Sequence, residues 1–89
     1  MDSDSIKKKL SSVANLPKDV TLGLPVITMT GQVEMSIENY RSIIEYTEIL
    51  IRVQSKSGQI KIKGSHLQIE YYTNDEMKIT GRIKSVEYM

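Results

Sequence analysis

The chain repeats one short pattern three times: apolar and polar residues alternate over four positions, and a glycine follows. The three copies span residues 27–31, 60–64 and 77–81. Strict alternation is the two-residue period of a β-strand with one buried face. A glycine inside a strand marks a bulge, a sharp bend or a close approach between backbones. We therefore expect Gly31, Gly64 and Gly81 to be structural glycines at bends in long antiparallel strands.

The first part of the chain has a different pattern. Apolar residues recur there at helical spacing, at Ile6, Leu10, Val13 and Ala14. This stripe predicts an amphipathic helix, or else a flexible tail, over residues 1–15. Residues 16–89 are then expected to form a single β domain. Because the hydrophobic core of an 89-residue chain is small, we also expect a homo-oligomer.

Several further stretches have strand-like patterns. A short strand is expected at 19–24, and long strands at about 26–38, 43–54, 59–72 and 77–88. The segments that join the long strands are short and rich in turn-forming residues. The predicted fold is all-β, an antiparallel meander of long bent strands curled into a small barrel or a folded sheet.

The apolar residues of the later strands change from one face to the other along each strand. In the strand at 59–72 they are even-numbered at Ile60 and Ile62, then odd-numbered from Leu67 onward. Pairing these strands as hairpins puts these changes of face side by side. It places Ile62 opposite both Ile51 and Val86, Ile69 opposite both Ile44 and Ile79, and Leu67 opposite Tyr46. When the apolar side chains of adjacent strands change face at the same level, the sheet is expected to have a crease there. The spacing of the glycines leaves a short β-solenoid open as an alternative.

The residue types that carry most catalytic chemistry are few. The chain has no cysteine, which suits a reducing compartment, and its one histidine, His66, has no partner in the pattern. The carboxylates of the first long strands, at Glu34, Glu38, Glu45 and Glu48, are expected on the solvated face. No glycine-rich phosphate loop or serine nucleophile motif occurs. We therefore expect no enzymatic activity, no cofactor, no metal site and no small-molecule substrate.

Charged residues divide the predicted outer face. The basic side chains are Lys61, Lys63, Lys78, Arg82 and Lys84, and acidic ones occupy the first strands. Two apolar residues, Leu50 and Tyr72, fall outside the core pattern. With a net charge of +1, such a face suits protein partners, and its interaction candidates are Lys61, Lys63, Lys84, Arg82, Leu50 and Tyr72. The alternative function is a small nucleic-acid-binding β-barrel with a regulatory role, although the only aromatic residues are tyrosines.

The start of the chain is acidic and polar, and no run of about 20 apolar residues occurs. These features predict neither a secretory signal nor a membrane span. We therefore expect a cytoplasmic protein.

Specific stretches of the chain resemble a known family. They are Leu16-Pro17-Lys18-Asp19-Val20, Leu24-Pro25, Ile37-Glu38-Asn39-Tyr40-Arg41-Ser42-Ile43, Glu45-Tyr46-Thr47, Ile51-Arg52 and Ile60-Lys61-Ile62-Lys63-Gly64. Together they resemble the YabP/YqfC family of sporulation proteins from Leu16 to the C-terminus. Tyr40 and Ser42 stand where family members often have His and Gly, which argues against a catalytic histidine in this turn.

The resemblance implies a role in endospore formation, in the mother cell of a spore-forming bacterium. It also implies a membrane protein partner of the YqfD type, and hence a peripheral position at the forespore membrane. It supplies no reaction and no catalytic residues. The resulting expectation is a structural protein, an assembly or adaptor module that acts through protein–protein interaction.

Overall fold

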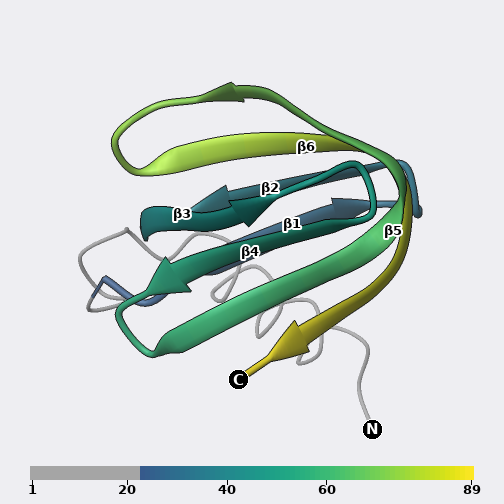
Figure 1. Ribbon diagram of the computed structural model, residues 1–89. Helices are drawn as coiled ribbons and strands as arrows, with labels where there is room; N and C mark the ends of the chain where they lie inside the picture. The colour runs from purple at the N-terminus through teal and green to yellow at the C-terminus, as the bar shows by residue number, and fades with distance from the viewer. Residues whose placement is uncertain (1–22) are drawn as a thin grey trace, which may run out of the picture.

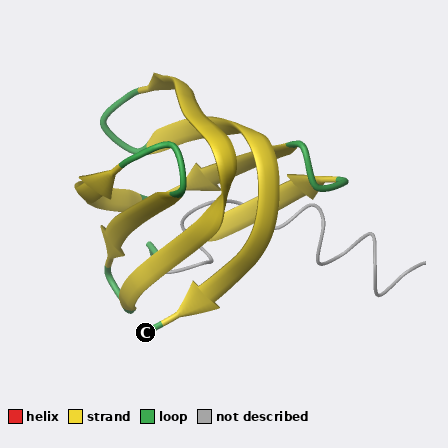
Figure 2. Ribbon diagram, turned by 45° about the vertical axis from the view of Figure 1, so that its right-hand side comes forward, coloured by secondary structure: helices red, strands yellow, loops and turns green. Residues whose placement is uncertain are grey.

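The computed structural model describes residues 23–89 as one curled sheet of six antiparallel strands (Figures 1 and 2). The strands are β1 (Val26–Thr30), β2 (Glu34–Glu38), β3 (Tyr40–Tyr46), β4 (Leu50–Ser55), β5 (Gly58–Tyr72) and β6 (Glu76–Tyr88). Their order in the sheet is β1-β2-β6-β5-β4-β3. The helix predicted at 1–15 and most of the strand predicted at 19–24 lie outside the described residues.

The all-β antiparallel class is confirmed. The sheet curls without closing, because β1 and β3 are both edge strands in the strand order. The alternative of a β-solenoid is wrong, since all the paired strands run antiparallel. A β-helix would instead stack its coils in parallel.

The longest strands agree closely with the sequence prediction. β5 and β6 cover almost the same residues as the strands expected at 59–72 and 77–88. Ile62 lies opposite Ile51 on β4 and opposite Val86 on β6, as predicted. Farther along, Ile69 lies opposite Ile79, which also agrees.

The predicted crease forms in the middle of β5 and β6. The β5–β6 register shifts between Lys63 and Gly64 and again between Ser65 and Gln68. Inside this irregular segment His66 has a positive φ of 54°. A Cβ atom on Gly64 would overlap the backbone carbonyl of Arg82, so the two strands approach each other there more closely than a side chain allows. Figure 2 shows both long strands bending around the molecule.

The prediction of one strand over 26–38 is wrong. The chain reverses after Thr30, and β1 and β2 form a hairpin in which Val33 N donates to Thr30 O at 3.3 Å. Gly31 has a φ of 51° and lies in this turn instead of at a bend within a strand. Glycine suits the position because it reaches positive φ without steric cost.

The prediction of one strand over 43–54 is also wrong. β3 and β4 form a second hairpin, and Thr47 Oγ1 accepts hydrogen bonds from Ile49 N (3.3 Å) and Leu50 N (2.9 Å). A threonine hydroxyl that binds nearby backbone amides favours a turn over a continuing strand. Residues 40–42, expected in a loop, already belong to β3, because the turn is made at Asn39 with a φ of 66°.

The splitting of this strand changes one predicted pairing. Tyr46 and Ile44 were expected opposite Leu67 and Ile69. Instead, β5 meets the tip of the β3–β4 hairpin, where Leu67 N donates to Glu48 O at 2.8 Å. Tyr46 still approaches β5, because its hydroxyl accepts a hydrogen bond from Ile69 N at 3.0 Å.

The core lies inside the curl of the sheet. Its buried apolar side chains are Met35, Ile37, Tyr40, Ile51, Val53, Ile60, Ile62, Leu67, Met77, Ile79 and Ile83. β2 joins this core beside β6 and not beside β3, which places Met35 opposite Ile79. The first hairpin therefore attaches to the far side of the β3–β6 meander. Within residues 23–89 there is no helix of the length and apolar character needed to cross a membrane.

Candidate functional site

Three of the predicted interaction residues lie together on the outer face of the sheet. Leu50 on β4 is directly opposite Lys63 on β5, and Lys61 follows on the same side of β5. Lys63 Nζ lies 3.7 Å from Glu87 Oε1 on β6, and both side chains are about half exposed. Leu50 and Lys61 are half-buried. This group, which we call the outer basic cluster, combines two ammonium groups with one apolar side chain.

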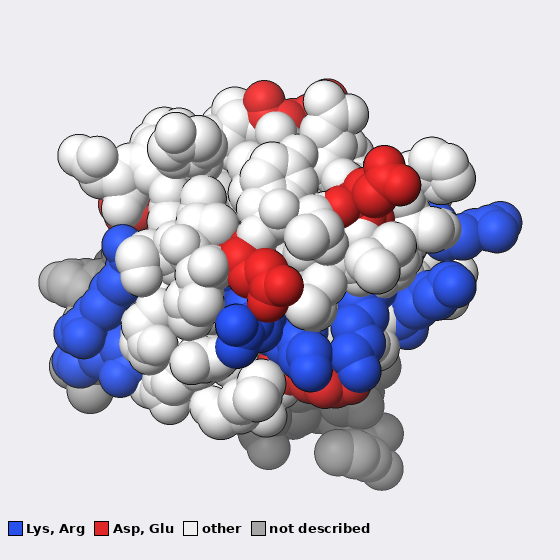
Figure 3. Space-filling model, viewed as in Figure 1, with Lys and Arg blue, Asp and Glu red and all other residues white. Residues whose placement is uncertain are grey.

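Two further predicted residues lie along β6 beside this cluster. Arg82 is opposite Ser65 at the crease, and Lys84 lies in the bulge just before Ser85, the residue opposite Lys63. Both side chains are exposed. Figure 3 shows Lys and Arg side chains gathered in a band across the lower part of one face, with acidic side chains mainly above it.

Tyr72 is not part of this cluster. It lies at the end of β5 opposite Met77, whereas Lys61 and Lys63 lie near the start of the same 15-residue strand. Its side chain is 65% exposed. The structure therefore separates Tyr72 from the other predicted interaction residues.

Acidic side chains of the early strands pair with basic ones across the sheet. Lys78 Nζ lies 2.9 Å from Glu34 Oε1 and 3.8 Å from Glu70 Oε2. The hydrogen bond to Glu34 is the main cause that raises the pKa of Lys78. Nearer the β3 edge of the same outer face, Arg52 Nε on β4 lies 2.9 Å from Glu45 Oε1 on β3. Because Lys78 lies among carboxylates, the outer face is less sharply divided than the sequence suggested.

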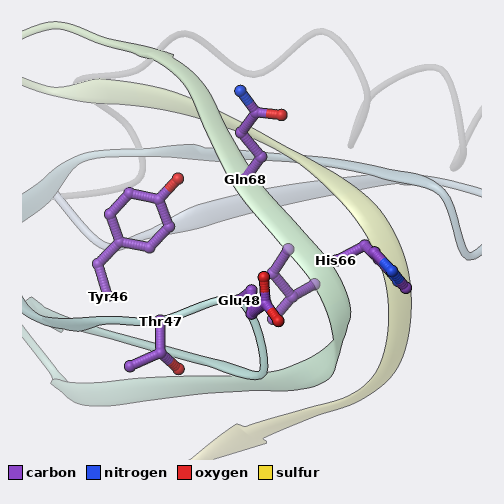
Figure 4. A pocket seen from close by; sticks show the side chains of 6 residues that line it. Tyr46, Thr47, Glu48, His66 and Gln68 are labelled. Carbon is purple, nitrogen blue, oxygen red and sulfur yellow. The ribbon is translucent and has the colours of Figure 1, made fainter.

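A hollow lies at the crease, between the β3–β4 turn and β5 (Figure 4). It has a volume of about 510 Å³ and is lined by Tyr46, Thr47, Glu48, His66, Leu67 and Gln68. In Figure 4 the side chain of His66 points away from Tyr46 and Glu48. Within the described part of the chain, no group of three or more His, Cys, Asp or Glu residues could hold a metal ion.

A second hollow, of about 380 Å³, lies beside the β5–β6 turn. Tyr40 at the start of β3 and Tyr72 at the end of β5 both line it. Tyr40 is buried, and its hydroxyl donates to Thr73 O at 2.5 Å. Burial is the largest cause that raises the pKa of Tyr40, followed by nearby Tyr72 and Asp75. Tyr40 thus ties the start of β3 to this turn.

We expect Tyr40→Phe to lower the free energy of unfolding by about 1 kcal/mol, because it removes the hydrogen bond to Thr73 and leaves the ring in place. Chemical denaturation measured by tyrosine fluorescence and circular dichroism checks this value. Tyr72→Phe, at an exposed position of the same hollow, is the control and should be nearly neutral. Equal losses in the two variants would contradict a structural role for the Tyr40 hydroxyl.

Sequence reasoning missed the exposed apolar residues at the edges of the sheet. Met29 and Tyr46 follow the core pattern, yet 42% and 50% of their side chains are exposed. Both belong to edge strands, β1 and β3. Alternation identifies the face to which a side chain points, but only the strand order shows that this face is uncovered at an edge.

Comparison with known proteins agrees with the resemblance found in the sequence. The model of the YabP family matches residues 24–89. The uncharacterized protein YqfC of Bacillus subtilis (strain 168) is 33% identical over 84 residues, which make up 94% of this chain and 90% of YqfC. No solved structure matches the chain. The match covers every strand of the sheet, and the chain therefore belongs to the YabP family.

Proposed function

We propose that this protein acts in endospore formation as an assembly or adaptor module, without catalysing a reaction of its own. Membership of the YabP family supports a sporulation-related role. The adaptor role is supported by the chemistry of the surface, where charged and apolar side chains lie together on the outer face.

The observation that carries the proposal is the outer basic cluster. Leu50 lies beside Lys61 and Lys63, with Lys84 close by on β6. Charged groups at the rim of an interface guide approach and orientation, whereas a central apolar side chain supplies buried contact. An acidic surface that surrounds a small apolar pocket would complement this arrangement.

The partner that we propose is a membrane protein of the YqfD type with an acidic surface exposed to the cytoplasm. Binding to it would bring this domain to the membrane around the forespore. Lys63 and Lys84 are exposed, so a partner can reach both ammonium groups without unfolding any strand.

Reversing two charges tests this surface. We expect Lys63→Glu combined with Lys84→Glu to reduce recruitment of a fluorescent fusion to the forespore strongly, because the cluster would then repel an acidic partner. Lys61 is left unchanged in this variant, since its side chain is half-buried.

The control carries the same change in net charge at another place. Arg41→Glu combined with Lys56→Glu alters the β3 edge and the β4–β5 turn, and should leave recruitment unchanged. Circular dichroism of both purified variants establishes that the fold is intact. Equal recruitment of the two variants would contradict a binding role for the outer basic cluster.

A further inference from the structure

The two edges of the sheet differ in how well they are protected. Among residues 23–89, β1 pairs only with β2 and β3 pairs only with β4, so each leaves one row of backbone N–H and C=O groups without a strand partner. Soluble proteins usually protect such edges with charged side chains or β-bulges.

β3 has both kinds of protection. Its register with β4 shifts twice, between Tyr40 and Ser42 and between Ile43 and Glu45. It also carries the charged side chains of Arg41 and Glu45. A bulged and charged edge is a poor template for another strand.

β1 has neither kind of protection. Its register with β2 is regular from the Val26–Glu38 pair to the Thr30–Glu34 pair. Its sequence, Val-Ile-Thr-Met-Thr, contains no charge and no proline, and four of its five residues are β-branched. Such a sequence strongly prefers extended structure. The strand that it forms has a straight edge, with neither a charge nor a bulge to hinder pairing with another strand.

The apolar face of β1 is also incompletely covered. Ile27 packs against the core, but Met29 is 42% exposed even though Met35, directly opposite on β2, is fully buried. The core-facing row of side chains therefore continues to the edge of the sheet and ends there uncovered. One more strand beside β1 would bury it.

We propose that this strand is β1 of a second copy, paired antiparallel about a two-fold axis at Thr28. The sequence of β1 is complementary to itself in this register: Ile27 of each copy faces Met29 of the other, and Val26 faces Thr30. No charge is buried, and the two sheets join into one. A symmetric interface of this kind closes on itself and so gives a dimer. The dimer is independent of the proposed role in sporulation.

Single cysteines test the pairing directly, because the chain has no cysteine of its own. At the two-fold axis, opposite Cα atoms of antiparallel strands lie about 4.5–5.5 Å apart, within the range that a disulfide spans. Thr28→Cys should therefore form a disulfide-linked dimer under mild oxidation. Ser42→Cys on the β3 edge is the matched control and should cross-link roughly tenfold less.

Mixed cross-linking fixes the register. Val26→Cys and Thr30→Cys should each cross-link poorly alone, because in the proposed dimer each faces the other position. Mixed together, they should form a disulfide between the two variants. Equal cross-linking of Thr28→Cys and Ser42→Cys would overturn the proposal.

A charge on the β1 edge provides a second test. Met29→Lys should weaken dimerisation about tenfold or more in sedimentation equilibrium, since an inward-pointing charge opposes strand pairing at an edge. Ile44→Lys is the control, because Ile44 is 41% exposed on the other edge. A wild-type protein that stays monomeric at high micromolar concentration would overturn the proposal. If Met29→Lys disturbs the fold, the cross-linking of Thr28→Cys decides.

Discussion

Replacement of Gly64 by valine is expected to lower the free energy of unfolding by about 3 kcal/mol. A Cβ atom at this position would overlap the carbonyl oxygen of Arg82 on β6 and press on the side chain of Leu67. The backbone of one strand would have to move away from the other, and the buried residues around the crease would lose contact. A well-packed core resists such displacement because it has little free volume.

Urea denaturation of the purified variant measures this loss. Gln68→Val is the matched control, because it places the same side chain on β5 at an exposed position beyond the crease. The control should change the free energy of unfolding by less than about 0.5 kcal/mol. A Gly64→Val protein as stable as the control would contradict the close approach of β5 and β6.

The second large effect is expected for Ile79→Ala, at about 3–4 kcal/mol. Ile79 is fully buried, and it lies between Met35 on β2 and Ile69 on β5. Removing three carbon atoms there costs transfer free energy and leaves a cavity where the first hairpin joins the meander. Because small domains are only marginally stable, a large fraction of this variant is expected to be unfolded at 37 °C.

Thermal unfolding followed by circular dichroism checks the second prediction. Ile44→Ala is its control, because the same atoms are removed from a side chain that is 41% exposed on the β3 edge. The control should lose less than about 1 kcal/mol. Similar midpoints for the two variants would mean that β2 does not pack on β6 as described.

The part of the fold that could be predicted from the sequence is the part with a distinctive pattern. In β5 the apolar residues change from Ile62 to Leu67, and Gly64 lies between them. The pairing that places these changes of face opposite one another in neighbouring strands also sets the register of the strands. The pattern therefore predicts the crease and the pairing of Ile62 with both Ile51 and Val86, as the structure has them.

The first hairpin could not be recognised in the same way. Its core-facing residues, Ile27, Met29, Met35 and Ile37, are all odd-numbered. A continuous strand and a hairpin with a three-residue turn both give this pattern, and Gly31 suits a bend and a turn alike. The sequence pattern therefore does not distinguish the two structures.

The second hairpin was missed for a different reason. The change of face between Tyr46 and Ile49 predicts a bend within one strand, whereas the structure places a turn there and a bulge within β3. Thr47 was the available signal, since its hydroxyl caps the turn. The candidate site could be predicted only in part. Alternation predicts that Lys61, Lys63 and Leu50 lie on the outer face, as they do. It does not predict that Tyr72 lies far from them, because that distance depends on the length of β5.

We propose that a membrane protein holds this domain at the forespore. The most direct test of this proposal is the position of a fluorescent fusion in sporulating cells with and without the YqfD-type partner. We expect a ring of fluorescence around the forespore that becomes diffuse in the mother cell when the partner gene is deleted. Immunoblotting of the fusion in both strains controls for loss of the protein. A fusion that remains around the forespore without the partner, at unchanged abundance, would contradict the account.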